Sequence, residues 1–197
     1  LGHVKLRLTG FGTDHQEIQD AVEKQIQLVL PQIQKYVYGF NEERLETAIG
    51  KLLRESGKTV ALAESCSGGY ISHLITTVPG SSQYLQGAVV PYHNEFKEKI
   101  LGVSAKTLET WGAVSEQTVQ EMSKGVRELF HADFGISSSG VAGPDGGSPE
   151  KPVGTVWIAC AGKDFVESKK LQLTQDRMLN IQLTGVAVLN LLRICIE

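Results

Sequence analysis

A hydroxyl, a phenol and an amine follow one another in the stretch GSSQYLQGAVVPYHNEFK, as Ser82, Tyr92 and Lys97. A serine attacks a carbonyl carbon only when a base removes its proton. A lysine can be that base when burial lowers its pKa from about 10.4 toward about 7–8, and the tyrosine could orient or relay. The same residues are also typical of a helix cap, a packed ring and a solvated lysine, and spacing alone favours that structural interpretation.

Hydroxyl residues and two glycines also stand in the segment AESCSGG, residues 63–69, between a strand and a helix. Backbone N–H groups at a helix N-terminus suit phosphate. A strand-to-helix turn capped by serine is the simpler interpretation. The segment lacks the Gly-Lys-Ser/Thr of a Walker A loop and is not Gly-x-Ser-x-Gly, so a hydrolase elbow is unsupported.

The segment SGVAGPDGGSPEKPVGTVW, residues 139–157, is longer than a plain hairpin turn needs. Gly140 and Gly143 allow close backbone approach to a ligand or an unusual φ. Successive free N–H groups in such a loop can hold an anion, so we favour a functional loop. Farther on, the forked donors of Arg177 suit phosphate or carboxylate; a surface salt bridge with Asp176 or Glu167 is the alternative.

Alternating strands and helices must position these segments from Asn41 onward. An amphipathic helix over 41–57, with Asn41 as cap and Gly57 as stop, begins the series, and Ser115 is expected to cap a long helix. This order predicts an α/β protein, a three-layer α/β/α sandwich with a mixed sheet, whose ligands gather where strands end. We expect strands over 58–65, 85–93, 133–140, 152–161 and 164–173. A helix should follow the two glycines within 65–82, and further helices are expected over 94–102, 104–112, 115–132 and 174–196.

The first forty residues predict a small α+β connector piece. Residues 4–9 alternate apolar and polar and are typical of a strand, and a helix with Asp14 as cap should include residues 18–33. Such a piece is too small to hold a core alone. Because the chain opens on Leu1, we expect residues 1–40 to be the connector remnant of a longer protein and 41–197 to be the principal domain.

Composition narrows the classes of partner. The chain has 197 residues, a formal net charge of −3 and 41% hydrophobic residues, which argues against nucleic-acid or membrane-surface partners. We find no run of about 18 apolar residues. Cys66, Cys160 and Cys195 cannot all pair within the chain, so a reduced, cytoplasmic compartment is expected. Neither these cysteines nor the scattered histidines have metal-ligand spacing, so we expect no metal and no cofactor.

At this point four collinear motifs resemble a known family. AESCSGG, PGSSQYLQGAVVPYHNEFKEKILGVS, GAVSEQTVQEM and SGVAGPDGGSPEKPVGTVW are similar, in order across about residues 42–197, to the C-terminal domain of the competence/damage-inducible protein CinA. That family includes the nicotinamide mononucleotide deamidases. The resemblance implies a metal-independent Ser/Lys amidohydrolase that converts nicotinamide mononucleotide and water to nicotinate mononucleotide and ammonia. We also expect the protein to be a homodimer.

The resemblance also implies roles for individual residues. Ser82, Tyr92 and Lys97 would be catalytic, with Ser65 or Ser67 as alternative nucleophiles. Three departures stand out: His93 where the family has a small residue, Gln175 in place of a glycine, and no second basic residue at 180–181. A non-enzymatic domain that binds a nucleotide or partner, and an amidase for another small amide, are the alternatives. The substrate-binding residues would be Ser65, Cys66, Ser67, Gly68, Asn94, Gly140, Val141, Ala142, Gly143 and Arg177.

Overall fold

The computed structural model describes residues 2–197, in two compact units. The first, residues 3–43, contains helix α1 (His15–Ile33) and the short helix η1 (Gln34–Tyr36). Asp14 caps α1 as expected, its carboxylate accepting from the N–H of Glu17. The strand expected over residues 4–9 is not formed: that segment is irregular. A strand needs a neighbour for its backbone groups, and this unit contains no other strand.

The second unit, which comprises residue 2 and residues 44–197 of the described chain, is built on one mixed five-stranded sheet. The strand order is β2-β1-β3-β4-β5, with β2, β1 and β3 parallel and β4 and β5 antiparallel. The predicted mixed sheet is therefore confirmed. The strands are β1 (Val60–Glu64), β2 (Leu85–Val89), β3 (Phe134–Gly140), β4 (Thr155–Ala161) and β5 (Val166–Gln172).

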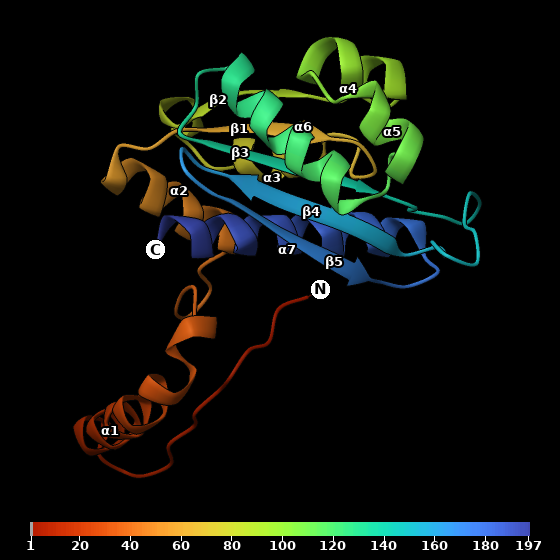
Figure 1. The fold of residues 1–197 in the computed structure, drawn as a ribbon. Coiled ribbons are helices and arrows are strands. Elements are labelled where there is room, and N and C mark those ends of the chain that lie inside the picture. Colours follow the sequence, from red (N-terminus) through yellow and green to blue (C-terminus); the bar gives the residue numbers. More distant parts are fainter. Residues whose placement is uncertain (1) are drawn as a thin grey trace. The chain divides into compact units, whose positions relative to one another are not determined.

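Helices cover both faces of this sheet, which confirms the three-layer architecture (Figure 1). One face carries α2 (Leu45–Ser56), α3 (Tyr70–Thr76) and α7 (Arg177–Ile196); the other carries α4 (Asn94–Leu101), α5 (Ala105–Trp111) and α6 (Glu116–Leu129). A short helix, η2 (Ser81–Gln83), precedes β2. By length and composition α7 alone, among the helices described, could cross a membrane; here it packs against α2, α3, β3 and β4.

Local signals explain several helix ends. The hydroxyl of Ser115 accepts from the N–H of Thr118 at 3.2 Å and caps α6, and Gly57 ends α2 in the left-handed conformation. The expected cap at Asn41 is wrong, because α2 begins at Leu45 with Arg44 before it. Asn41 has φ +56°, whereas an N-cap residue needs an extended backbone.

The order of the strands creates one switch point. The chain leaves β1 through α3 to β2 on one side, then returns through α4, α5 and α6 to β3 on the other side of β1. Ligands of open α/β sheets bind at the carboxyl ends of strands where the connections diverge. We call this edge the carboxyl edge; Ser65 follows β1 there, Val141 follows β3, and residues 90–93 follow β2.

Candidate active site

The carboxyl edge brings a serine and a lysine into contact. Lys97 lies on α4 with 1% of its surface exposed. Its Nζ donates to the Oγ of Ser65 at 3.2 Å, to the carbonyl of Pro91 at 2.8 Å and to the carbonyl of Tyr92 at 3.3 Å. Two carbonyls after β2 thus aim the amine at the hydroxyl after β1.

The orientation of α4 is the reverse of what hydropathy predicts. Phe96 and Ile100, one turn apart, are 45% and 41% exposed, while Lys97 is buried. Burial lowers the pKa of the Lys97 amine below its usual range. A lysine with a lowered pKa carries a neutral amine more of the time and can accept a proton. The contact therefore has the chemistry of a base beside a hydroxyl.

Ser82, the serine that the resemblance puts in the nucleophile's place, lies exposed in η2. In the described chain, no hydrogen bond joins it to Lys97. Ser65, by contrast, is buried and donates its backbone N–H to the carbonyl of Ser138 on β3 at 3.0 Å. The structure thus gives Lys97 a serine partner, and that partner is Ser65.

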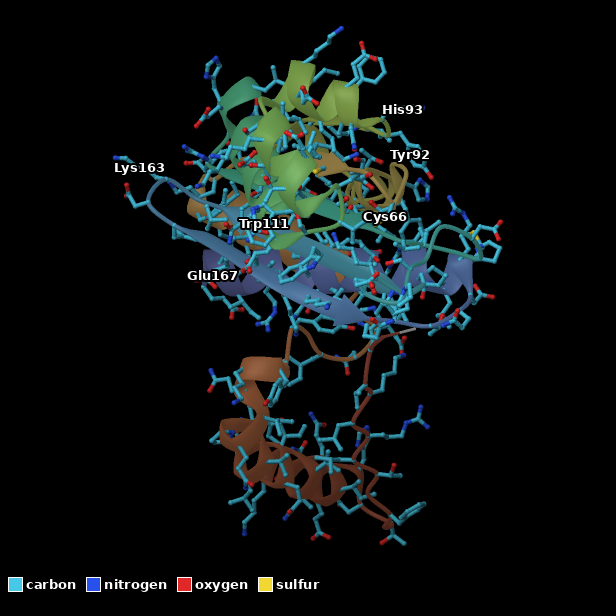
Figure 2. The ribbon with its side chains drawn as sticks, turned by 45° about the vertical axis from the view of Figure 1, so that its right-hand side comes forward. Cys66, Tyr92, His93, Trp111, Lys163 and Glu167 are labelled. Atoms are coloured by element: carbon cyan, nitrogen blue, oxygen red, sulfur yellow. The ribbon has the colours of Figure 1, made fainter. Side chains whose placement is uncertain are left out.

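Tyr92 joins this contact to the start of α7. Its carbonyl accepts from Lys97, and its exposed phenol oxygen accepts from Nη2 of Arg177 at 3.1 Å. In Figure 2, Tyr92 and His93 project outward on the side of the domain where Cys66 lies, whereas Lys163, in the β4–β5 turn, lies at the opposite side. Asn94, in the first turn of α4, is exposed beside them.

The N-terminus of α3, a candidate phosphate site, is occupied by the protein itself. Glu64, 1% exposed, directs its carboxylate at this helix end. It accepts from the backbone N–H groups of Gly69, Ile71 and Ser72 and from the hydroxyls of Ser67 and Ser72. These are the donors that a phosphate would need. Glu64 therefore engages the donors that the alternative, phosphate binding, would use, and the simpler interpretation of a strand-to-helix turn fits the structure.

The remaining members of the AESCSGG segment have structural surroundings. Ser67 is buried, and its hydroxyl also shares a hydrogen bond of 2.7 Å with that of Ser138. Burial raises the pKa of the Cys66 thiol to about 12, so this cysteine is a neutral thiol and a poor nucleophile. Gly68 is exposed with φ +61°, in the turn between β1 and α3.

Two residues of α7 hold the loop after β3. Nη1 of Arg177 donates to the carbonyl of Gly143 at 2.8 Å, and Nδ2 of Asn180 donates to the carbonyl of Ala142 at 3.0 Å. The guanidinium is exposed, and it has N–H groups beyond those that bond Gly143 and Tyr92. Val141 pairs with Thr155 and Gly154 through its backbone. The loop is thereby fixed beside Tyr92.

Close packing against other protein atoms requires glycine at both of these positions in the loop. A Cβ on Gly140 would lie 2.6 Å from Cγ2 of Val156, and one on Gly143 would lie 2.5 Å from Cγ1 of Val153. Gly143 also has φ +89°. The expected unusual φ is therefore present at Gly143. The interpretation that the missing side chains make room for a ligand is wrong, because both positions face protein atoms.

Glu64 and Asn180 have roles at this edge that sequence reasoning missed. Each is 1% exposed and stands in an apolar element, Glu64 at the end of VALAE and Asn180 in the helix RMLNIQLTGVAVL. A polar residue in an apolar stretch is buried only when its hydrogen bonds are met. A polar residue within an apolar stretch was therefore the signal in the sequence that could have identified Glu64 and Asn180.

The fold and the site define a class: an α/β domain whose sheet edge joins a serine to a buried lysine. Comparison with known proteins identifies the family. Residues 42–196 match the CinA C-terminal domain, and the chain belongs to that family.

Longer proteins with related names match most of the chain. The chain is 52% identical over 192 residues to a CinA-like protein of Cytophaga hutchinsonii, covering 98% of the chain and 46% of that protein. It is 46% identical over 184 residues to a putative competence-damage inducible protein of Halothermothrix orenii, covering 93% and 45%. The chain thus spans about half the length of the curated relatives it matches.

A crystal structure of a CinA superfamily protein from Klebsiella pneumoniae superimposes with a TM-score of 0.75 at 33% identity, over 77% of this chain and 95% of that one. A competence/damage inducible protein from Agrobacterium tumefaciens gives 0.72 at 34%, over 81% and 96%. Both likenesses support the α/β fold described above.

Proposed function

We propose that the domain is a metal-independent amidohydrolase that converts nicotinamide mononucleotide and water to nicotinate mononucleotide and ammonia. One observation carries the proposal: the buried amine of Lys97 lies 3.2 Å from the hydroxyl of Ser65 at the switch point of the sheet. The resemblance to the deamidases of the family supplies the substrate. The chemistry follows from the pair itself.

In the first half-reaction, Nζ of Lys97 takes the proton of Ser65 as its Oγ bonds to the carboxamide carbon. The carbonyl oxygen becomes a negatively charged oxyanion. When the tetrahedral intermediate collapses, the carbon–nitrogen bond breaks and Lys97 gives its proton to the leaving nitrogen. Ammonia departs, and the nicotinoyl group stays on Ser65 as an ester.

In the second half-reaction, water attacks the ester carbon and Lys97 takes its proton. The carbon–Oγ bond then breaks, and the proton returns to the serine. Nicotinate mononucleotide leaves, and the enzyme is restored. A lysine with a lowered pKa serves both halves, because it must accept and release a proton near neutral pH.

Ser65 is the nucleophile of this proposal because it is the hydroxyl that Lys97 reaches. The resemblance gives that role to Ser82, which remains the alternative. Ser67 is less suited, since its hydroxyl is engaged with Glu64 and Ser138. Ser65 and Ser82 lie on different elements and can be replaced independently.

The nucleotide's phosphate and ribose require donors outside the reacting pair. Arg177 offers an exposed guanidinium, oriented by the Tyr92 phenol and the Gly143 carbonyl. Arginine suits phosphate because its donors match two oxygens at once. Tyr92 and Asn94 are exposed at the same edge. We therefore assign substrate binding to the rim formed by Arg177, Tyr92, Asn94 and the loop after β3.

The test is an assay of ammonia and of the acid product after incubation with nicotinamide mononucleotide. Nicotinamide, nicotinamide riboside and glutamine are the comparison amides. We expect release from the mononucleotide and little from the others, since they lack the phosphate. If ammonia were released only from one of the comparison amides, that amide would be the substrate in place of nicotinamide mononucleotide. Binding of the mononucleotide without release would favour a non-enzymatic nucleotide-binding domain.

Two further expectations belong to this proposal. We propose a cytoplasmic location, in keeping with the free cysteines Cys66, Cys160 and Cys195. We also propose a homodimer, which the exposed apolar side chains of Phe96 and Ile100 support. The molar mass in solution, measured by light scattering, tests the dimer.

A further inference from the structure

Two backbone N–H groups of the loop after β3 have no acceptor among the residues that the structure describes. Within residues 2–197, the N–H groups of Ala142 and Gly143 donate to no backbone or side-chain atom, while Val141 donates to Thr155. Ala142 and Gly143 are both buried. Buried N–H groups without an acceptor are rare, because leaving one unmet is costly. An acceptor from outside the chain fits these positions.

The carbonyls of the same peptide groups fix where these N–H groups point. The carbonyl of Val141 accepts from the N–H of Gly154 at 2.8 Å. The carbonyl of Ala142 accepts from Nδ2 of Asn180 at 3.0 Å. In a planar trans peptide the C=O and the following N–H point in opposite directions. The N–H of Ala142 is therefore directed away from Gly154, and that of Gly143 away from Asn180.

Asn180 is itself held without freedom to turn. It is 1% exposed. Its Oδ1 accepts from the backbone N–H of Thr174 at 2.8 Å and from the hydroxyl of Thr174 at 2.9 Å, and its Nδ2 donates to the carbonyls of Ala142 and Thr174, both at 3.0 Å. Because the N–H of Thr174 can only donate, the amide has one consistent orientation.

We propose that Asn180 is a positioning residue: by holding the carbonyl of Ala142, it directs the N–H of Gly143 toward a negatively charged oxygen of the substrate, beside the N–H of Ala142, which the contact between Val141 and Gly154 directs. That oxygen belongs to the phosphate or to the oxyanion formed at the carboxamide. The inference rests on the proposed function for the identity of the substrate. Short-range donors of this kind act only when their direction is fixed.

The kinetic test replaces the amide of Asn180 by a carboxylate. Asn180→Asp keeps an acceptor for Thr174 but sets an oxygen against the carbonyl of Ala142. We expect kcat/KM for nicotinamide mononucleotide to fall by about 10- to 100-fold per folded molecule. A fall in kcat would assign the N–H groups to the oxyanion, and a rise in KM to the phosphate.

Thr184→Val is the matched control, because Thr184 is equally buried on α7 and its hydroxyl donates only to the carbonyl of Asn180 within the helix. We expect it to lower the melting temperature without changing kcat/KM. Unchanged kcat/KM in Asn180→Asp, or an equal loss in Thr184→Val, would overturn the positioning role.

A second measurement needs no turnover and no Asn180 variant. In ¹⁵N-labelled Lys97→Met protein, nicotinamide mononucleotide should shift the amide resonances of Ala142 and Gly143 more than that of exposed Gly146. Inorganic phosphate should reproduce the shifts if the phosphate is the ligand. Unmoved resonances would overturn the inference. Shifts in a protein whose wild type releases no ammonia would uphold the inference and refute the proposed hydrolysis.

Discussion

The Nζ of Lys97 donates to the Oγ of Ser65 across 3.2 Å, although the two residues are 32 positions apart in the chain. Ser65 follows β1 and Lys97 is carried by α4, after β2. Because β1 and β2 are parallel neighbours, their carboxyl ends meet and bring the two side chains together. The carbonyls of Pro91 and Tyr92 hold the amine in this direction.

Replacing the amine should abolish activity and spare the fold. We expect Lys97→Met to lower kcat for nicotinamide mononucleotide by about 10²- to 10⁴-fold, the range for a general base. The melting temperature should not fall, because an apolar chain of similar length replaces a buried amine.

Lys99→Met is the control for the change at Lys97. Lys99 lies two residues on in α4 and makes an exposed ion pair with Glu95, so both activity and stability should stay near wild type. If Lys97→Met kept the wild-type kcat, Lys97 would have no part in the mechanism. The same would follow if only His93→Ala lost activity.

The lowered pKa of Lys97 predicts two pH effects of the same sign. Activity should rise as the amine loses its proton, at a pH below the usual value for lysine. Stability should also rise with pH between the lowered pKa of the folded state and about 10.4 in the unfolded chain. In that window the unfolded chain binds a proton that the folded chain does not. The stability gained from the neutral Lys97 amine is lost as pH falls through the pKa of the folded state.

Urea unfolding at a series of pH values measures the stability effect. The difference in free energy of unfolding between wild type and Lys97→Met should move in favour of wild type as pH rises. An identical pH dependence in both proteins would show that Lys97 titrates as an ordinary lysine.

Gly143 should be required for stability. Gly143→Ala places a Cβ 2.5 Å from Val153 at φ +89°, and we expect a loss of about 1–3 kcal/mol. Gly146→Ala is a matched control, since φ is +87° there but the nearest atom, on Val141, lies 3.9 Å from the added Cβ. Thermal unfolding should show the smaller loss for Gly146→Ala; equal losses would discount the Val153 contact.

Chelators should leave the activity unchanged. In the part of the chain that the structure describes, no group of three or more His, Cys, Asp or Glu side chains could hold a metal ion, and the proposed base is an amine. Activity is measured before and after EDTA dialysis. A large loss that one divalent cation restores would refute the metal-independent mechanism.

The sequence predicted the layers and the edge at which the candidate residues lie, because alternating strands and helices bring strand ends together. It did not predict the pairing of Lys97 with Ser65. Helical spacing would bury Phe96 and Ile100 and expose Lys97, and the structure reverses this. Only the strand order and the packing of α4 fix that orientation.

The N-terminus of α3 shows a second limit. Glycines before a helix are typical both of an anion site and of a turn that closes on its own protein. The decision rests on where the Glu64 carboxylate points, toward Gly69 and Ser72. Strand alternation cannot show this for β1, since all its residues are buried.

The central claim is that Lys97 activates Ser65, and the activity of Ser65→Ala on nicotinamide mononucleotide, with Ser82→Ala beside it, tests this most directly. We predict that ammonia release by Ser65→Ala falls at least about 10³-fold, as expected for loss of a nucleophile, while its melting temperature stays near that of wild type and Ser82→Ala keeps most of its activity. Near-normal ammonia release by Ser65→Ala, with loss of activity in Ser82→Ala, would contradict the account and assign the nucleophile to Ser82.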